Sequence, residues 1–381
     1  MFLVVALARL LEARVRFVAK ITSAVVCTLL GITFSNLGVI PHTSPIHEAV
    51  YDFAVPYTIV LVILSSRLRD LRRAGPWVVI AFLVASAGSF AGGLIAGLVF
   101  NGWVGPETWK VGGMFTASFV GGGMNFAAVG RGLGCSPGVF AAAAMADNLT
   151  TVPWMLTLMF LSRALAPWFH DRQENAPGSS PVVTEIGPET HAVSPADPEP
   201  DLRRTWGSSA VSITDLAVLA ALPLGILWMA KQLAPLAPGF PDVLWVTTIA
   251  LVVAQIPAIH RVRGAAAAAY FSLHLFFIVV GASSDLREVI LAGPSIVVLM
   301  VAIIFVHALV AFGGGWLLRL RLPEIAVGSM ASLGGPGSSL ALAMAMKWNT
   351  LATPAVIIGI FGWAIGNYFG FGCAYLLRWL G

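Results

Sequence analysis

Hydrophobic residues run along this chain in segments of about 20 positions with almost no charge, for example Trp77 to Phe100, Ser295 to Leu318 and Ala355 to Leu377. A helix needs that length to span the hydrocarbon of a bilayer. Spans of a β-barrel would alternate polar and apolar positions over about ten residues, and no such alternation is present. The pattern predicts an all-α polytopic membrane protein of about 10–12 transmembrane helices.

A polar stretch at residues 171–209 divides the apolar segments into two groups. It is rich in Pro, Ser, Glu and Asp and nearly lacks large apolar residues, so it cannot bury enough surface to fold alone. We interpret it as a disordered polar linker between a first membrane repeat, residues 1–170, and a second, residues 210–381. A tether is the favoured role, and a regulatory tail is the alternative.

The two groups of segments repeat each other. Ser65 to Pro76 reads SSRLRDLRRAGP and Ser283 to Pro294 reads SSDLREVILAGP, the same residues at S, S, L, R, A, G and P with an offset of 218. Farther along, Ala117 to Asn125 (ASFVGGGMN) matches Ala331 to Ser339 (ASLGGPGSS) at an offset of 214. Repeats interrupted by glycine or proline at corresponding places are typical of the binding site of a secondary transporter.

Both repeats are therefore predicted to contain a discontinuous helix. A break inside the bilayer leaves backbone groups unpaired, at a cost of several kcal/mol each unless protein, water or a ligand satisfies them. The alternative is that the glycines only allow close packing of helices. The predicted break residues are Gly121, Gly122 and Gly123 in the first repeat and Gly334, Gly335, Pro336 and Gly337 in the second.

The direction of the second repeat is ambiguous from the sequence. The first repeated block is rich in arginine and its counterpart is nearly neutral, which favours inverted repeats with the arginines in the cytoplasm. Counting every apolar segment as a span instead puts six crossings between the blocks and makes the repeats parallel. We favour inversion, which requires that one segment fails to cross, and Val211 to Met229, with Pro223 inside it, is the first suspect.

Composition supports the membrane class and narrows the partners. The 381 residues are 58% hydrophobic and 10% charged, against about 25% charged in soluble domains. The net charge of +4 comes from Lys and Arg at segment ends, so positive-inside bias explains it better than a nucleic-acid partner. The three cysteines are isolated and predict neither disulfides nor zinc. Met1 to Leu11 is interpreted as the stub of a membrane helix, with no cleavable signal peptide.

Asp147 is the strongest candidate for chemistry. It lies about ten residues into the segment that starts at Gly138, which places it near the bilayer midplane. An ionisable group at that depth is a functional hypothesis by default. Its carboxylate could bind Na⁺ or carry a proton, and Asn148 could add a neutral oxygen ligand. The structural alternative is an aspartate that caps a broken helix.

Other polar residues stand next to the predicted breaks. Asn125, Ser338 and Ser339 could bind ion or substrate, or could cap the half-helices. Ser118 and Ser332 correspond by repeat and are weaker candidates, because membrane serines usually bond their own backbone. Asn367 lies deep in the last segment, as Asp147 does in its own. His274 and His307 could relay protons, although a lone membrane histidine is more often a hydrogen-bond partner between helices.

Three motifs resemble those of the YjcL-like uncharacterised membrane protein family, the domain of unknown function 819. They are GGGMNFAAVGRGLG (Gly121 to Gly134), MADN (Met145 to Asn148), and SLGGPGSSLALAMA with PAVIIGIFGWAIGNYFG. That family is itself distantly similar to bile acid and glutamate sodium symporters, whose discontinuous helices cross at the ion and substrate site. The resemblance implies that Asn125 and Ser338 line such a crossing, with Asp147 beside it.

The function predicted is an ion-coupled (Na⁺ or H⁺) secondary transporter of a small, organic solute, without enzymatic activity. No cofactor is expected and no metal beyond Na⁺ at Asp147. The expected partners are the lipid bilayer, in the inner membrane if the chain is bacterial, and the solute, with a homodimer left open. The alternatives are an intramembrane serine protease using Ser338 or Ser339 with His307, and a channel. The sequence lacks the GxSG motif expected of such a protease, and neither alternative explains a duplicated site.

Overall fold

The computed structural model describes residues 1–14, 18–64, 66–169, 211–237 and 240–381. Over these ranges the chain is helical without strands, apart from an isolated bridge between Gly102 and Gly105, so the all-α prediction is confirmed. The predicted linker at 171–209 lies outside the described residues. Five described helices are long and apolar enough to cross a membrane: Pro45–Ile63, Pro76–Val99, Ile213–Leu236, Val289–Leu317 and Asn349–Leu380.

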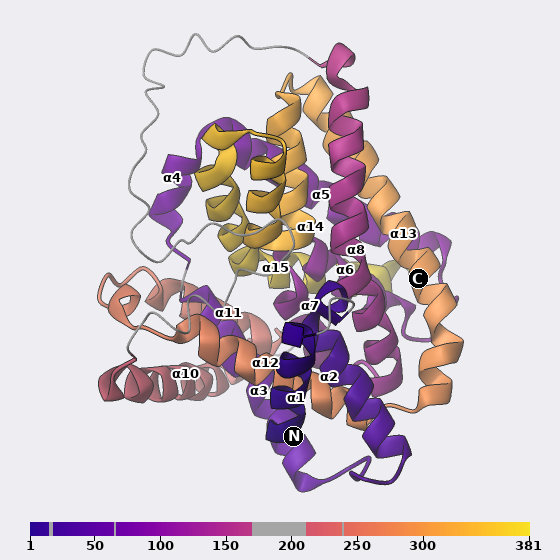
Figure 1. Cartoon of the computed structure of the whole chain (residues 1–381), viewed down its shortest axis with the longest axis vertical. Helices are drawn as coiled ribbons and strands as arrows, with labels where there is room; N and C mark the ends of the chain where they lie inside the picture. Colours follow the sequence, from indigo (N-terminus) through magenta and orange to yellow (C-terminus); the bar gives the residue numbers. More distant parts are fainter. Residues whose placement is uncertain (15–17, 65, 170–210, 238–239) are drawn as a thin grey trace.

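Fourteen α-helices make up the described part of the chain (Figure 1). The predicted stub forms the first of them, and proline stands in the first turn of α3, α5, α8 and α14, where its missing N–H leaves no bond unmade. The helices of the first half are α1 (Phe2–Arg14), α2 (Val18–Asn36), α3 (Pro45–Ile63), α4 (Leu71–Ala74), α5 (Pro76–Val99), α6 (Thr108–Gly121), α7 (Gly123–Gly132) and α8 (Pro137–Ala164). Those of the second half are α10 (Ile213–Leu233), α11 (Asp242–Val253), α12 (Ala265–Ala282), α13 (Leu286–Leu317), α14 (Leu322–Ala345) and α15 (Ala352–Leu380).

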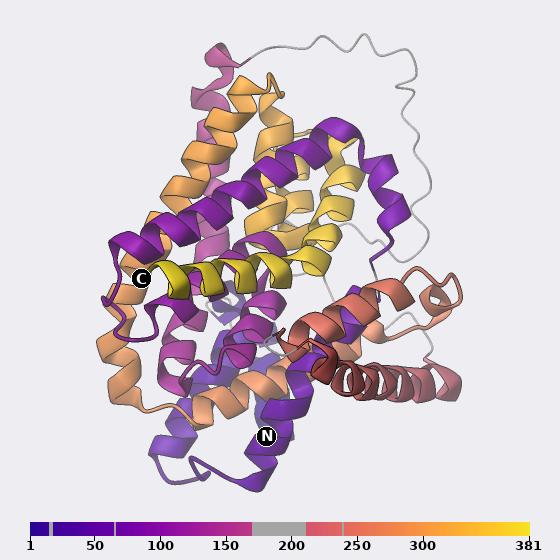
Figure 2. The same cartoon turned by 180° about the vertical axis from the view of Figure 1, so that it is seen from behind.

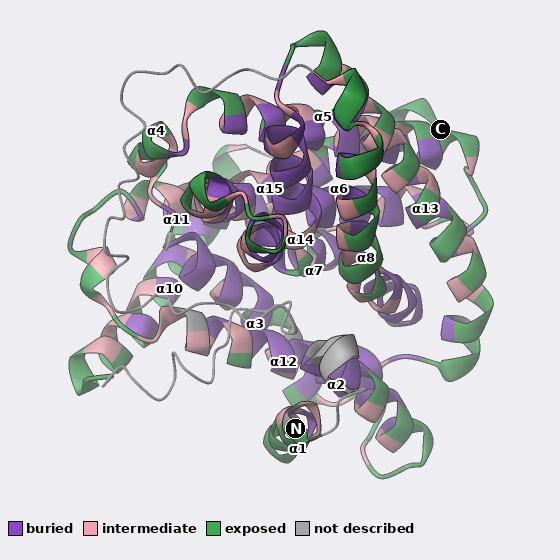
Figure 3. Ribbon diagram, turned by 45° about the horizontal axis from the view of Figure 1, so that its top comes forward, coloured by how far each residue is buried: buried purple, intermediate pink, exposed green. Residues whose placement is uncertain are grey.

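The helices group into two bodies, and each body draws on both halves of the sequence. Helices α1, α2, α3, α10, α11 and α12 pack mainly with one another, and we call them the scaffold body. Helices α5 to α8 and α13 to α15 form the core body (Figure 2), which contains the extensively buried helices α6 and α14 (Figure 3). Only a few helix pairs join the bodies, among them α3 with α7, α8 with α12, and α11 with α15.

Helices α5 and α13 cross in opposite directions through closely packed glycines. Gly88 lies against His307 and Gly92 against Ile303, so residue numbers increase along α5 where they decrease along α13, and the two helices are antiparallel. At this crossing Ser89 Oγ lies 2.9 Å from His307 Nδ1, and the two residues are 218 positions apart, the offset of the repeated blocks. In the scaffold body Ser272 donates to the carbonyl of Ala54, again 218 positions apart. Residues separated by the offset of the first repeated block therefore touch directly in both bodies.

We expect Gly92→Ala to destabilise the protein by about 1–3 kcal/mol, because the new Cβ would lie 2.5 Å from the carbonyl oxygen of Ile303, a backbone atom that cannot move aside alone. Thermal unfolding in detergent measures the effect. Gly313→Ala on α13 is the control, because nothing lies within 4 Å of its added Cβ. Equal Tm values for the two variants would contradict the close crossing.

The first repeated block folds differently in the two halves. In the first half it forms a short helical turn and α4, which ends where Gly75 adopts a φ of +83°. In the second half the block is helical from Leu286, and α13 continues through Pro294. A short basic helical segment that ends at Gly75 therefore stands in the first half where the second half has a continuous helix.

Candidate functional site

Both predicted discontinuities are present as single residues with the same backbone conformation. Gly122, between α6 and α7, has φ 76° and ψ 179°, and Gly335, inside α14, has φ 71° and ψ −167°. This region of positive φ is accessible to glycine without strain. The two break glycines are 213 positions apart, one fewer than the offset of 214 between the second pair of repeated blocks. A Cβ built on either glycine would lie 3.7–3.8 Å from Trp363 Nε1, so the two breaks face one indole.

Helices α6 and α7 form a hairpin that returns to the side it came from. Glu107, just before α6, accepts hydrogen bonds from Ser136, just after α7, at 2.6 Å from Oγ and 3.2 Å from N. Lys110 Nζ donates to the carbonyl of Gly134 at 2.7 Å, and Gly130 packs against Met114. The break at Gly122 is thus the tip of the hairpin, and its two ends are bonded to each other.

We expect Glu107→Gln to lower Tm by about 1–3 °C near neutral pH. Burial raises the pKa of Glu107, but the hydrogen bonds from Lys110 and Ser136 outweigh burial and hold the pKa below its ordinary value. Because the pKa of Glu107 is lower in the folded state than in the unfolded state, the stabilisation is complete at pH values above the unfolded-state pKa. It is lost as the pH falls through the folded-state pKa. Thermal scans from pH 7 to pH 3 check that the Tm values of wild type and variant converge at low pH. A Tm difference that is unchanged at pH 3 would contradict this role of Glu107.

Side chains satisfy the carbonyl groups that the breaks expose. The carbonyl of Phe119, in the last turn of α6, accepts from Ser89 at 2.7 Å and also from Ser332. Asn125 Nδ2 donates to the carbonyl of Gly121 at 2.7 Å. In the second half Ser339 Oγ lies within 3.1 Å of the carbonyls of Gly335, Pro336 and Ala355. Side chains of the core body therefore satisfy the unwound backbone at both breaks, Gly122 and Gly335, which we call the two tips.

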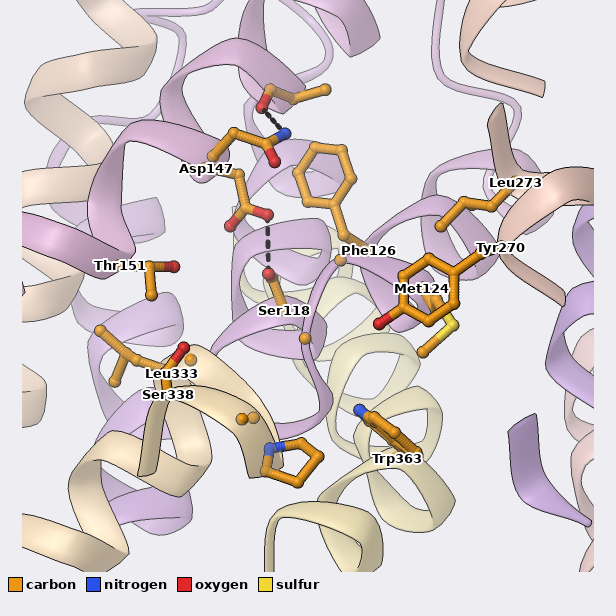
Figure 4. Close-up of a pocket in the computed structure, with 18 of the residues that line it drawn as sticks. Ser118, Met124, Phe126, Asp147, Thr151, Tyr270, Leu273, Leu333, Ser338 and Trp363 are labelled. Carbon is orange, nitrogen blue, oxygen red and sulfur yellow. Dashed lines mark hydrogen bonds between the residues drawn. The ribbon is translucent and has the colours of Figure 1, made fainter. Parts of the chain in front are cut away.

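The two tips open onto one cavity of about 150 Å³ between the core and scaffold bodies (Figure 4). Asp147 projects into it from α8, and its Oδ2 accepts a hydrogen bond of 2.9 Å from Ser118 Oγ. The scaffold body contributes a wall from α12. The lining comprises Ser118, Gly122, Gly123, Met124, Phe126, Ala144, Asp147, Asn148, Thr151, Val152, Tyr270, Leu273, Phe277, Leu333, Gly334, Gly335, Pro336, Gly337, Ser338 and Trp363.

Most of the residues singled out from the sequence meet at this cavity, and some lie elsewhere. Asp147, Ser118, Ser338 and all break residues except Gly121 line it, whereas Asn125, Ser332 and Ser339 bond carbonyls inside the core body. Asn148 lies on the lining and donates to the carbonyl of Ala144 in its own helix at 2.8 Å. Asn367 is fully buried and donates to Thr247 on α11 at 2.9 Å, at a contact between the two bodies.

Both histidines weighed from the sequence have partners away from the cavity tips. His307 bonds through one ring nitrogen to Ser89 and through the other to Ser329, at 2.9 and 2.8 Å. The nucleophilic pair imagined for a protease, His307 with Ser338 or Ser339, is therefore not assembled. His274 lies between Ser23 Oγ and the carbonyl of Tyr270, at 2.7 and 2.6 Å. Both act as links between helices.

Three lining residues with hydrogen-bonding side chains were missed from the sequence: Thr151, Tyr270 and Trp363. Thr151 lies one turn beyond Asp147 on α8, so its hydroxyl stands on the same face of that helix. That helical spacing could have identified it. Tyr270 and Trp363 belong to other helices, α12 and α15, and reach the cavity only through tertiary packing.

The described residues contain no group of three or more His, Cys, Asp or Glu side chains arranged to hold a metal. Several long apolar helices and a partly buried carboxylate among glycine-broken helices define the class, an integral multi-pass membrane protein. A family model described as "Protein of unknown function (DUF819)" matches residues 1–380, and the chain belongs to this family. It is similar to "Uncharacterized membrane protein YjcL" of Bacillus subtilis (strain 168), with 27% identity over 376 residues, 94% of this chain and 91% of that protein. The resemblance to this family is confirmed.

Proposed function

We propose that this protein is an ion-coupled secondary transporter. The observation that carries the proposal is the cavity itself, where two helix breaks of the same conformation face one indole beside a carboxylate. Broken helices at a repeat interface present their half-helix ends to ions and solutes near the membrane midplane. The cavity also lies between two bodies that share few contacts, so relative movement of the bodies could open it to either side.

The contacts also support an inverted relation of the halves. Two helices that carry the same repeated position, α5 and α13, run antiparallel where that position meets its counterpart. If the α6–α7 hairpin is re-entrant rather than crossing, four spans lie between α5 and α13, and the count then agrees with the antiparallel packing. Most of the Val211 to Met229 segment belongs to α10, which can cross under this topology. The segment that fails to cross is then the α6–α7 hairpin.

This topology makes a prediction of sidedness. The loop with Arg69 lies in the cytoplasm by the positive-inside rule, so both ends of the α6–α7 hairpin lie outside. We expect a cysteine at exposed Asn101 to react with an impermeant maleimide in intact cells, and a cysteine at Arg69 to react only after permeabilisation. Both would be introduced into a chain whose three native cysteines are replaced. Equal labelling of the two sites in intact cells would contradict the topology.

Asp147 is the proposed ion ligand or proton carrier. Its carboxylate, the hydroxyl of Ser118 and the hydroxyl of Thr151 are hard oxygen donors of the kind that alkali cations prefer. The rest of the lining is mainly glycine backbone and apolar side chains, so a change of charge at Asp147 would strongly alter the electrostatic potential in the cavity. Binding of an ion there would also change how the tips accept a solute, since both share one small space.

The test is uptake by proteoliposomes that contain the purified full chain. A library of labelled metabolites is offered under an inward Na⁺ gradient, an inward H⁺ gradient, or neither. A transporter accumulates a solute above its outside concentration, and an ionophore that collapses the driving gradient abolishes the accumulation. Downhill flux that never exceeds equilibrium would indicate a channel, and conversion of the solute without accumulation would indicate an enzyme.

A further inference from the structure

A second cavity, of about 450 Å³, lies at the basic end of the scaffold body, away from Asp147. It opens between α10, the end of α3, the loop before α12, and one residue of α15. Apolar side chains form most of its wall, and charged ones gather at one end. Its lining comprises Leu64, Arg67, Asp70, Val218, Leu219, Leu222, Ile259, His260, Val262, Ala265 and Ile360.

The polar end of this cavity carries an uncompensated positive charge. Arg67 is half-buried, and within the described ranges no carboxylate forms an ion pair with it. The cavity's own acid, Asp70, lies 3.7 Å from Arg73 and is balanced by it. Exposed Arg69 and Arg261 stand in the two adjoining loops, so no acidic group of the lining is left to offset Arg67.

The loop that carries Arg67 is held in place by hydrogen bonds. Gln255, after α11, accepts from the Leu68 N–H and donates to the Ser66 carbonyl, both at 3.2 Å. Ser66 Oγ donates to the carbonyl of Ile360 on α15 at 3.3 Å. The guanidinium therefore projects from a fixed backbone, and the loop ties the scaffold body to the core body at this point.

The apolar end of the cavity is made by the most outward helix of the scaffold body. Val218, Leu219 and Leu222 of α10 face the cavity, while Leu216 and Trp228 on the same helix are 59% and 63% exposed. Figures 1 and 2 show α10 at the margin of the molecule, beside α11. In a bilayer that outer face meets acyl chains, and the cavity residues Val218 and Leu222 are only half-buried, so the apolar end of the cavity borders the lipid.

We propose that this cavity binds an anionic phospholipid, with the headgroup phosphate on Arg67 and an acyl chain along α10. Basic pockets between membrane helices on the cytoplasmic side are suited to acidic headgroups, and the guanidinium binds phosphate through two parallel hydrogen bonds. A soluble phosphate would satisfy Arg67 and leave the apolar wall uncovered, which favours an amphiphile. The bound lipid would bridge α10 and Ile360, and so would stabilise one placement of the bodies.

Native mass spectrometry of the full chain, released from detergent with phosphatidylglycerol or phosphatidylcholine, tests the proposal. Wild type is expected to retain one phosphatidylglycerol in preference to phosphatidylcholine, and Arg67→Gln to bind it about tenfold more weakly. Arg67→Lys is expected to keep part of the affinity. Leu222→Trp, which fills the apolar end, is expected to lose retention with every charge in place.

Arg72→Gln is the matched control, because Arg72 is an exposed arginine of the same basic segment that does not line the cavity. Loss of retention in Arg72→Gln equal to that in Arg67→Gln would show diffuse attraction to the basic surface and overturn the site. Thermal shifts with inorganic phosphate or glycerol phosphate separate the two sources of phosphate. Stabilisation by these soluble anions equal to that by phosphatidylglycerol would also overturn it. The proposal is independent of transport, since Asp147→Asn should bind the lipid as wild type does.

Discussion

Asp147→Asn is expected to abolish ion-coupled uptake while leaving a folded protein. Asparagine has nearly the same shape and can still accept from Ser118, so the packing of α8 is preserved. The variant loses the one carboxylate of the cavity, and losing a charge-assisted contact costs about 2–3 kcal/mol, which corresponds to about 100-fold weaker binding of the coupling ion. Thermal shift of purified protein against Na⁺ concentration and pH gives the ion affinity, and proteoliposome uptake gives the coupling.

Two further variants decide how the result is interpreted. Ser118→Ala removes the hydroxyl that bonds Asp147 and should weaken the ion response by about tenfold or less. Glu48→Gln removes an exposed carboxylate on α3 and should change nothing, because Glu48 is remote from the cavity lining. An Asp147→Asn protein with unchanged ion dependence would show that Asp147 does not couple the ion.

Substitutions at the two helix breaks should have the next largest effect. Gly122→Ala and Gly335→Ala each force an L residue into positive φ with ψ near 180°, a region essentially restricted to glycine, at a cost of about 1–3 kcal/mol. Each variant also alters the tip that faces Trp363 and the cavity, so we expect uptake to fall by at least about tenfold even where the protein remains folded. Initial rates of uptake, compared with Tm, separate the effect on the site from the effect on stability.

Gly38→Ala is the matched control for backbone strain. Gly38 has a φ of +72°, close to that of the two tips, and nothing lies within 4 Å of its added Cβ. It should lose stability because of its positive φ and keep normal uptake. If Gly38→Ala impaired uptake as much as Gly122→Ala, backbone strain alone would explain both variants and the tips would have no special role.

Segment length and glycine pattern were enough to predict the helical class and the places where helices break. They could not reveal the path of the chain at a break. The apolar run from Trp109 to Leu133 has the length of a full span, yet α6 and α7 turn back at Gly122 because Glu107 bonds Ser136 and because Gly130 packs on Met114. Hydropathy reports how much chain avoids water and carries no information about its direction.

The candidate site was predictable to the extent that a residue was unusual for its surroundings. A carboxylate among alanines identified Asp147, and Ser338 stood out beside a glycine run. Tyr270 and Trp363 are ordinary in an apolar helix, so only packing shows that they face the cavity. Asn125 was indistinguishable from a ligand in sequence, because an amide that bonds an exposed carbonyl and an amide that binds a solute occur in the same place.

The contact between Ser89 and His307 has a consequence for how such a chain could diverge. In a dimer of identical subunits, a residue on the two-fold axis must meet its own copy, so a hydroxyl can face only a hydroxyl there. Here two positions separated by the offset of the first repeated block meet as a serine and a histidine, and His307 also bonds Ser329. A contact made within one polypeptide is free of this self-complementarity, so either of its two positions can change without the other.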